Sequence, residues 1–369
     1  MNDLPAISIV LPTYNGSKYL KDSIESIIAQ TFYDWELIIV DDCSTDKTSE
    51  IILEYLGRDE RIRSKRNSVN MKLPKSLNEG FKASQGRYLT WTSDDNMYRE
   101  DALETMYSFM EENRFYPMVV ADTSVKDWAS GYTGKISYDA DQMLLYNCVG
   151  ACFLYRREVL DKIGGYDKEL FCVEDYEYWM RVLANYGEIG HINQTLYSYR
   201  LHPESLTETK KDYVIMQRRR VYRRYAPWII GRMRHDKTRL LKLYSELIMG
   251  KECSDDELRT LFRTELPIDG EGSIPENARI ILFGAGTYGK RALEKLGERV
   301  FCFADHSMDF TGKEINGKRI IRFEEMVCLI KNEKIYHVVL AADVDKQYSM
   351  MQELSDAGIE EFSVLARCF

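Results

Sequence analysis

Two adjacent carboxylates, Asp94 and Asp95, are the first residues in the chain whose types suit metal chemistry. They follow the apolar run at residues 89–92. Carboxylate oxygens are hard ligands, so at a strand end this pair suits Mg²⁺ or Mn²⁺ whose other ligands are phosphate oxygens. Taken alone, adjacent aspartates in such a place are more often solvated turn or cap residues. The pair therefore needs support from the rest of the sequence.

A second group of residues suits a dinucleotide. Gly284, Gly286 and Gly289 lie between an apolar strand and a helix, and Asp305 follows Gly284 by 21 residues at the next strand end. Glycines at this spacing bring backbone amides and a helix N-terminus close to a diphosphate, and the acidic residue suits a ribose. The motif predicts a nucleotide site separate from the Asp94–Asp95 pair. It supports an NAD(P)-dependent sugar reductase as one possible class of function.

The elements that must position the first group alternate between strand and helix, a pattern typical of a parallel sheet with helices on its faces. Aspartates at 41, 42, 94 and 95 then fall just after strands, at the edge where open α/β sheets bind ligands. The expected strands are 7–11, 35–40 and 88–92, and the expected helices are 19–30, 49–57 and 76–83.

Length and composition narrow the class of protein. A chain of 369 residues suits two or three domains, and a formal charge of −9 argues against nucleic acid as a partner. The eight cysteines show no zinc-binding spacing and several lie in apolar runs, so we expect reduced core cysteines and a cytoplasmic protein. No leader peptide is recognisable, and no apolar run approaches the ~20 residues that cross a bilayer.

The C-terminal part predicts a further α/β unit. The polar stretch at 266–278 carries two Pro and two Gly and is typical of a linker. After it we expect a helix at 287–296 and strands at 279–283, 300–304, 338–341 and 362–365. The expected domains are 1–207, a basic helical linker region at 208–272, and a smaller Rossmann-like domain at 273–369.

Six motifs follow one another along the first part of the chain. They are ISIVLPTYNG (7–16), LIIVDDCSTD (37–46), LNEGF (77–81), GGYD (164–167), EDYEYWMR (174–181) and YRLHPES (199–205). In order and in spacing, over roughly residues 5–207, they strongly resemble the motifs of family 2 glycosyltransferases. Any one motif is unspecific, whereas the set is quite specific.

The resemblance implies a GT-A fold, in which a Rossmann-like nucleotide-binding half with a mixed sheet joins an acceptor half. It implies an inverting hexosyltransferase that uses a nucleotide-sugar donor, most commonly a UDP-sugar, with Mn²⁺ or Mg²⁺. The implied acceptor is a glycan or lipid-linked glycan of the cell surface. The C-terminal unit resembles small Rossmann-like domains of bacterial polysaccharide-modifying enzymes, which makes nucleotide-sugar binding and purely structural packing two alternatives for it.

At the nucleoside end, the resemblance implies that Pro12, Tyr14 and Asn15 contact the donor and that Asp42 accepts a hydrogen bond from the imide of the base. Family members often carry an arginine shortly before the Asn-x-Gly element. Here the nearest cations are Lys72 and Lys75, which become the candidates for the diphosphate.

At the reacting end, the resemblance implies that Asp94 serves ribose or metal and that Asp95 binds the metal. The usual motif separates its two aspartates by one residue. In this chain the two aspartates are adjacent, so the motif alone does not assign the role of metal ligand to one of them. His202 suits the metal or the leaving diphosphate, with a plain loop histidine as the alternative.

The resemblance also implies that Asp175 is the general base and that Glu174 lies on the nucleotide-sugar side. A sugar hydroxyl needs such a base, because it is a poor nucleophile until its proton is taken. The alternative is that the two acids open a helix, whose N-terminus favours negative charge. The two interpretations are compatible, because a helix would hold the carboxylate in place.

A strongly basic segment at 210–242 has twelve Lys or Arg against two Asp, a local charge of +10. We expect a helical segment broken near Pro227. With Trp228, Ile229 and Ile230 beside its arginines, it suits peripheral contact with the anionic inner face of a membrane that carries the acceptor. The alternative is a solvated helix pair that packs against either domain.

Overall fold

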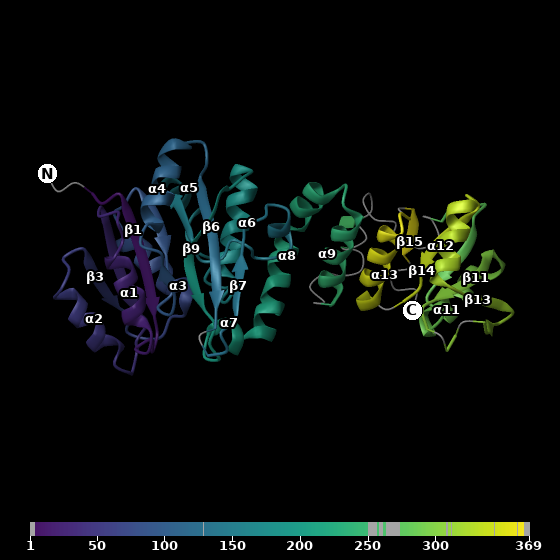
Figure 1. Ribbon diagram of the computed structural model, residues 1–369, viewed down its shortest axis with the longest axis horizontal. Helices are drawn as coiled ribbons and strands as arrows, with labels where there is room; N and C mark the ends of the chain where they lie inside the picture. The colour runs from purple at the N-terminus through teal and green to yellow at the C-terminus, as the bar shows by residue number, and fades with distance from the viewer. Residues whose placement is uncertain are drawn as a thin grey trace. The chain divides into compact units, whose positions relative to one another are not determined.

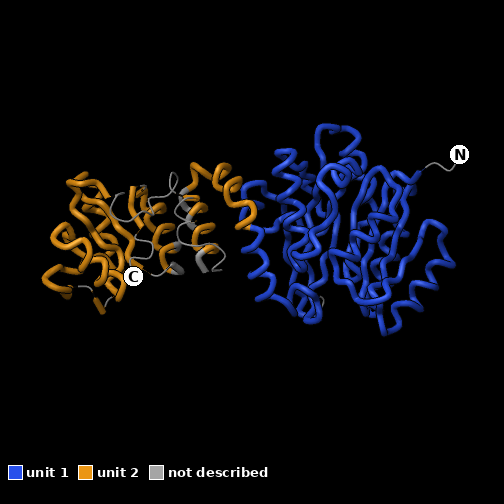
Figure 2. Tube along the Cα trace, turned by 180° about the vertical axis from the view of Figure 1, so that it is seen from behind, with its two compact units in different colours: residues 1–221 blue, residues 222–369 orange. Residues whose placement is uncertain are grey.

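A computed structural model describes residues 4–127, 129–249, 257, 261–262, 274–307, 309–310, 312–342, 344–359 and 361–364. The chain divides into two compact units, Met1–Val221 and Tyr222–Phe369 (Figure 2). This division falls within helix α8 (Lys211–Met233), whereas the first boundary expected from the sequence is residue 207. The predicted linker at 266–278 lies mostly outside the described residues.

The first unit is built on one mixed sheet, which has nine strands among the described residues (Figure 1). Its order is β3-β2-β1-β4-β8-β6-β9-β5, with β7 paired to β6. The first four strands run parallel, β8 runs antiparallel to both β4 and β6, and β6 is parallel to β9. The strands are β1 (Ile7–Thr13), β2 (Trp35–Asp41), β3 (Ile62–Arg66), β4 (Tyr88–Trp91), β5 (Met97–Tyr98), β6 (Met118–Lys126), β7 (Thr133–Ile136), β8 (Phe153–Arg156) and β9 (Gly190–Arg200).

Helices pack on both faces of this sheet. Alternate residues of β1 and β2 join the core formed with α1, α2 and α4, while α3 packs against the opposite side of the same strands. That approach is close, because a Cβ at Gly80 would lie 2.3 Å from Val10 Cγ1. The helices are α1 (Leu20–Ile28), α2 (Thr48–Leu56), α3 (Leu73–Ala83), α4 (Ala102–Glu112), α5 (Arg157–Ile163), α6 (Glu174–Tyr186) and α7 (Leu206–Thr209), with a 3₁₀ turn η1 (Gln142–Leu144).

The α/β class and the mixed sheet are confirmed, and the three strands and three helices predicted in the first half occur within a few residues of their expected ends. The sequence pattern predicts no strands between residues 118 and 200. β6 to β9 complete the sheet there, and residues far apart in the chain become neighbours because β8 inserts between β4 and β6.

The second unit contains a six-stranded sheet among its described residues, ordered β12-β13-β11-β10-β14-β15 and parallel except for the β12–β13 pair. Its apolar core includes Ile280, Leu282, Phe303 and Val339. The strands are β10 (Arg279–Phe283), β11 (Val300–Asp305), β12 (Glu314–Ile315), β13 (Lys318–Arg322), β14 (Tyr336–Leu340) and β15 (Phe362–Val364). The helical elements are α9 (Lys237–Met249), α11 (Thr287–Leu296), η3 (Gly297–Arg299), α12 (Phe323–Asn332) and α13 (Val344–Asp356).

The predicted break near Pro227 is wrong, because helix α8 runs through this proline. Proline removes one backbone hydrogen bond and normally kinks or ends a helix. Here Ala226, Ile229 and Ile230 are buried around it, and their burial offsets the loss. The burial of the two isoleucines also favours packing over insertion of these side chains into a membrane.

Cysteine placement corrects one expectation. Cys148, Cys152 and Cys302 are buried, but Cys43 and Cys172 are partly accessible and Cys328 is exposed, so the cysteines are not uniformly core residues. All six are free thiols; Cys253 and Cys368 lie outside the described residues.

Within the part of the chain that the structure describes, we find no helix with the length and apolar character needed to span a membrane.

Candidate active site

The predicted metal-binding pair lies where the strand order of the first sheet reverses. The chain passes from β1 outward to β2 and β3, then returns to β4 on the other side of β1. Thr13 ends β1, and its hydroxyl donates a hydrogen bond to Asp94 Oδ2 just beyond β4. Crevices at such reversal points are where open α/β sheets bind ligands.

A pocket of about 450 Å³ opens at this point. Most of the predicted site residues line it: Pro12, Tyr14, Asn15, Asp42, Lys72, Asp94, Asp95 and His202. Three predicted residues are not part of its lining. Lys75 is exposed on α3, while Glu174 and Asp175 begin α6.

Strained backbone is concentrated at this pocket. Asn15, Cys43, Lys72 and Cys172 have φ angles of 55°, 68°, 72° and 72°. Asn15 and Lys72 line the pocket, and the two cysteines follow the lining residues Asp42 and Phe171. Non-glycine residues in this region cost on the order of 1–3 kcal/mol each and persist where the surrounding structure enforces them. The loops of this pocket are therefore held in one shape.

Asp42 organises the nucleoside end of the pocket. Its carboxylate is almost fully buried and accepts hydrogen bonds of 2.8 Å from Asn67 Nδ2 and from the backbone amides of Met71 and Lys72. Three donors leave Asp42 Oδ2 with one further lone pair for a ligand. In the structure, Asp42 fixes the loop that carries Lys72. The predicted contact of Asp42 with the base of a nucleoside would be a second role for the same carboxylate.

Asn15 joins the first two motifs. The backbone N–H of Asn15 donates to Ser44 Oγ at 2.9 Å, and the side-chain Oδ1 of Asn15 accepts from the backbone N–H of Thr45 at 2.8 Å. Beside it, the Tyr14 side chain is half exposed at the pocket wall. Asn15 therefore acts at least as a tie between the loops after β1 and β2, and Tyr14 offers an aromatic face to a ligand.

Asp94 is held by its neighbours rather than by solvent. A Cβ at Gly16 would lie 2.0 Å from Asp94 Oδ2, so only glycine at that position allows the carboxyl to sit against Thr13. Burial, and secondarily the charge of Asp95, raise the pKa of Asp94 to about 7.

Asp95 and His202 contact each other in the lining of the pocket. His202 Nε2 lies 3.0 Å from Asp95 Oδ2, while Asp95 Oδ1 and His202 Nδ1 are buried with no hydrogen-bond partner among the described residues. Arg200 Nε donates to the backbone oxygen of Asp95 at 3.0 Å and so fixes the loop. The imidazole also packs 5.1 Å from the ring of Tyr19.

These two side chains fit a divalent cation. Each side chain has one buried atom without a partner, and a carboxylate oxygen and an imidazole nitrogen are both ligand types that a divalent cation accepts. Mg²⁺ and Mn²⁺ sites in nucleotide enzymes commonly use one or two protein carboxylates, with substrate phosphates as further ligands. Among the described residues, no group of three or more His, Cys, Asp or Glu side chains is arranged to hold a metal ion.

Glu174 and Asp175 begin helix α6, as the helix alternative for this pair predicted. Asp175 is half-buried; its Oδ1 accepts from the backbone amide of Tyr176 at 2.6 Å, and its Oδ2 accepts from Asn147 Nδ2 at 2.8 Å. Burial, then the charge of Asp175, raise the pKa of Glu174 to about 8. Burial raises the pKa of Asp175 as well, although both hydrogen bonds oppose the rise.

Tyr199 links the two acidic ends of the site. Burial raises the pKa of its phenol, and the negative charges of Asp95 and Asp175 raise it further. Both carboxylates therefore lie within electrostatic reach of one side chain on β9.

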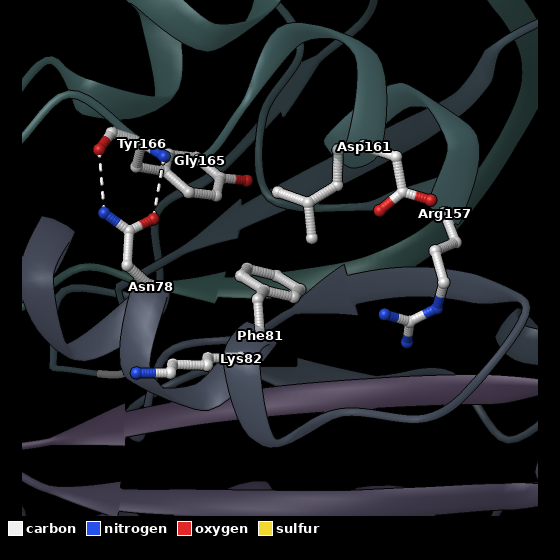
Figure 3. Close-up of a pocket in the computed structure, with 8 residues that line it drawn as sticks. Asn78, Phe81, Lys82, Arg157, Asp161, Gly165 and Tyr166 are labelled. Atoms are coloured by element: carbon white, nitrogen blue, oxygen red, sulfur yellow. Dashed lines mark hydrogen bonds between the residues drawn. The ribbon is translucent and has the colours of Figure 1, made fainter.

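Asn78 joins α3 to the GGYD loop, beside a second pocket of about 470 Å³ (Figure 3). Its Nδ2 donates to the Tyr166 carbonyl and its Oδ1 accepts from the Tyr166 amide, both at 2.8 Å. A Cβ at Gly165 would lie 2.4 Å from Asn78 Oδ1, which explains the glycine. Two sequence motifs thus form one structural clamp.

Several lining residues are not predicted by the sequence motifs. Lys18, Phe171, Glu204 and Lys210 line the main pocket, and Lys18 Nζ pairs with Glu204 Oε2 at 3.1 Å. Asn147 was missed because residues 122–150 match no recognised pattern. The first group could have been suspected from its closeness to the motifs in sequence; for Asn147 we see no signal in the sequence.

Comparison with known proteins places these motifs in a family. The model of "Glycosyl transferase family 2" matches residues 8–164. An uncharacterised glycosyltransferase of Methanocaldococcus jannaschii is 31% identical over 209 residues, which cover 54% of this chain and 72% of the relative. The chain belongs to glycosyl transferase family 2.

Other glycosyltransferases match over a similar length. TuaG of Bacillus subtilis, a glycosyltransferase named for teichuronic acid biosynthesis, is 28% identical over 56% of this chain and 83% of its own. GlyG of Streptococcus pneumoniae is 27% identical over 56% of this chain and 74% of its own.

Solved structures share the fold of this glycosyltransferase. S. aureus TarS 1–349 superposes with a TM-score of 0.50 at 16% identity, over 69% of this chain and 82% of that one. The mannosyltransferase PcManGT of Pyrobaculum calidifontis gives 0.52 at 13% identity, over 71% and 80%. Both support the GT-A class of the mixed sheet.

The glycine loop of this glycosyltransferase's second unit lies between β10 and α11, as predicted. A Cβ at Gly284 would lie 2.6 Å from the Ala341 carbonyl, and one at Gly289 would lie 2.0 Å from the Gly284 carbonyl, so close packing explains these two glycines. Gly286 has open space around it. Asp305 Oδ2 accepts the Ala285 amide at 2.8 Å, and this bond engages one of the amides predicted to face a diphosphate.

Proposed function

We propose that this chain transfers a hexosyl group from a nucleoside diphosphate to a hydroxyl of a glycan or lipid-linked glycan, with inversion, in cell-surface polysaccharide synthesis. One observation carries the proposal: Asp42, Asp95 and His202, from three separate motifs, line a single pocket at the reversal point of the sheet. The pocket combines a hydrogen-bond acceptor for a base with a cation site for a diphosphate.

The donor is proposed to be a UDP-sugar. A TarS structure that contains UDP-GlcNAc superposes with a TM-score of 0.50, and PcManGT was solved with GDP-Man and Mn²⁺. In this chain, Pro12 and Tyr14 form a wall for the base, and Asp42 Oδ2 has a lone pair for the imide N–H. Lys72 lies on the same pocket and supplies positive charge for the diphosphate.

The metal end is proposed to consist of Asp95 and His202, with Mn²⁺ or Mg²⁺ as the ion. The ion, when bound, neutralises charge on the leaving diphosphate. Asp94, held by Thr13, shapes the loop and faces the ribose. Arg200 keeps the Asp95 backbone in place, so that the carboxylate points into the pocket.

Asp175 is proposed to take the proton of the acceptor hydroxyl. As the acceptor oxygen forms its bond to the anomeric carbon, the bond from that carbon to the diphosphate oxygen breaks, and its electron pair leaves with the nucleoside diphosphate. One displacement inverts the anomeric centre, and the acceptor proton ends on Asp175. A base of this kind contributes about 10²–10⁴-fold to rate.

The test is a panel of UDP- and GDP-sugars with Mn²⁺ and mono- and oligosaccharide acceptors, followed by nucleotide release and product mass. Asp95→Asn and Asp175→Asn should each lower transfer by about 10²-fold or more. Asp34→Asn, a change at an exposed aspartate before β2, is the matched control and should transfer like wild type. Retention of full transfer by both site variants would overturn the assignment.

Two further predictions concern regions outside this pocket. NADH in the same panel tests the reductase alternative, which fails if no nicotinamide cofactor raises the melting temperature. Co-sedimentation with vesicles of anionic lipid, compared with neutral vesicles, tests membrane contact through residues 210–242; equal binding to both would exclude an electrostatic contact.

A further inference from the structure

Asn147 contacts the proposed base although no motif includes it. It lies on the loop after η1, and its Nδ2 donates to Asp175 Oδ2 at 2.8 Å. The backbone N–H of Val149 can only donate, and it approaches Asn147 Oδ1 at 3.4 Å. The amide is thereby oriented with its oxygen toward Val149 and its nitrogen toward the carboxylate.

The loop that carries Asn147 is anchored to the helix that carries the base. Tyr176, the residue after Asp175, donates its hydroxyl to the Leu144 carbonyl at 3.2 Å. Met143, Leu144 and Leu145 are buried beneath this bond. The separation between Asn147 and Asp175 is therefore set by packing as well as by their own hydrogen bond.

The two acids of the pair have unequal surroundings. Asp175 accepts from Asn147 through one oxygen and from the Tyr176 amide through the other. Glu174 is almost fully buried, and its Oε2 has no hydrogen-bond partner among the described residues. Backbone amides at residues 172–174 also favour ionised Glu174, although its burial outweighs them. Two adjacent carboxyls do not both ionise easily, so the more accessible Asp175, whose two oxygens both accept a hydrogen bond, holds the charge.

We propose that Asn147 is a positioning residue that keeps the single negative charge of the Glu174–Asp175 pair on Asp175, where the acceptor proton is taken. This inference rests on the proposed function. Without the Asn147 donor, Asp175 retains only backbone amides as donors, as Glu174 does. The preference of the charge for Asp175 then shrinks, and the proton is shared between the two acids.

Other ionisable groups near Asp175 lie on helix α6, on the segment between α5 and α6, and on β9. Glu174 is on the same helix, Cys172 is on the loop before it, Tyr166 is on the GGYD loop and Tyr199 is on β9. Burial raises the pKa values of the thiol and of both phenols above their usual range, so these three groups stay neutral while Glu174 and Asp175 titrate. The Asn147 donor is thus the contact whose removal changes the pair most directly.

The experiment measures the pH dependence of kcat/KM for wild type, Asn147→Ala and Asn147→Asp, with the donor and acceptor found in the panel. The acidic midpoint should rise by about one pH unit or more in Asn147→Ala. It should rise further in Asn147→Asp, which keeps the shape but replaces the donor with an acid. A residue that only shaped the loop would give the opposite order, with Asn147→Asp close to wild type.

A second readout does not depend on activity. Asn147 stabilises the ionised form of Asp175, so the melting-temperature difference between wild type and Asn147→Ala should be small at low pH and grow as Asp175 ionises. Asn185→Ala removes an exposed amide from the far end of the same helix and is the matched control, with no pH-dependent difference.

The outcomes separate this inference from the proposed function. Transfer that survives Asp175→Asn would overturn the base assignment itself. If Asp175→Asn abolishes transfer while the midpoint and the melting difference are unchanged in both Asn147 variants, the role of Asn147 alone is overturned.

Discussion

The His202 imidazole lies 3.0 Å from the Asp95 carboxylate, although 107 residues separate them in the chain. We expect His202→Ala to weaken Mn²⁺ binding about 10-fold or more, because it removes one of two proposed protein ligands. Calorimetry with Mn²⁺ and UDP measures the effect. His235→Ala, a change at an exposed histidine, is the control. Unaltered Mn²⁺ affinity in His202→Ala would remove His202 from the metal site.

Glu174 makes stability depend on pH. The pKa of Glu174 is about 8 in the folded protein and near 4.5 when solvated. The stability that its buried, neutral carboxyl contributes to the folded protein is therefore fully present below about pH 4.5 and is lost as pH rises through about 8. Glu174→Gln cannot ionise and should become more stable than wild type over this window, on the order of a few kcal/mol at pH 8.

Urea unfolding at pH 4.5, 6 and 8 measures this difference. Glu188→Gln, a change at an exposed position beyond the end of α6, should follow wild type at every pH. A constant difference between Glu174→Gln and wild type across these pH values would contradict the buried, neutral state of Glu174.

The clamp between Asn78 and Tyr166 predicts non-additive mutations. Asn78→Ala removes two hydrogen bonds and should cost about 1–3 kcal/mol. Gly165→Ala should also destabilise, because its Cβ would overlap Asn78 Oδ1. The double variant should cost less than the sum, since the shorter side chain removes the overlap.

Chemical unfolding of the two single variants and the double variant completes this cycle. Gly57→Ala, whose Cβ would meet its first neighbour at an ordinary 3.6 Å, serves as the glycine control. Strict additivity would show that Gly165 is required for another reason.

The glycines of the second unit should differ in their tolerance of alanine. Gly289→Ala should lower the melting temperature, because its Cβ would lie 2.0 Å from a backbone carbonyl. Gly286→Ala should change stability by no more than about 0.5 kcal/mol, because its φ is −75° and nothing lies within 4 Å.

The same pair tests the second nucleotide site. If a UDP-sugar or NADH raises the melting temperature of wild type through this loop, Gly286→Ala should reduce the rise without changing the ligand-free value. A ligand effect that Gly286→Ala leaves intact would place the ligand elsewhere.

Local pattern predicted much of this fold. Strand segments such as those around Ile9 and Ile38 alternate with helix segments, and each is recognised from a short stretch of sequence. The strands of the nucleotide-binding half and the helices between them were therefore predictable. So was the placement of Asp42 and Asp94 after strands. The motif order also predicted the family, because spacing along the chain is what a family resemblance measures.

Tertiary structure decided which residues meet. β8 and β9 join the sheet through long-range pairing that no short segment encodes, and this pairing brings His202 to Asp95. The absence of Lys75 from the pocket, the passage of α8 through Pro227 and the contact of Asn147 with Asp175 likewise depend on packing between distant segments. Sequence spacing determined which residue types were present, whereas close packing determined which of them share a site.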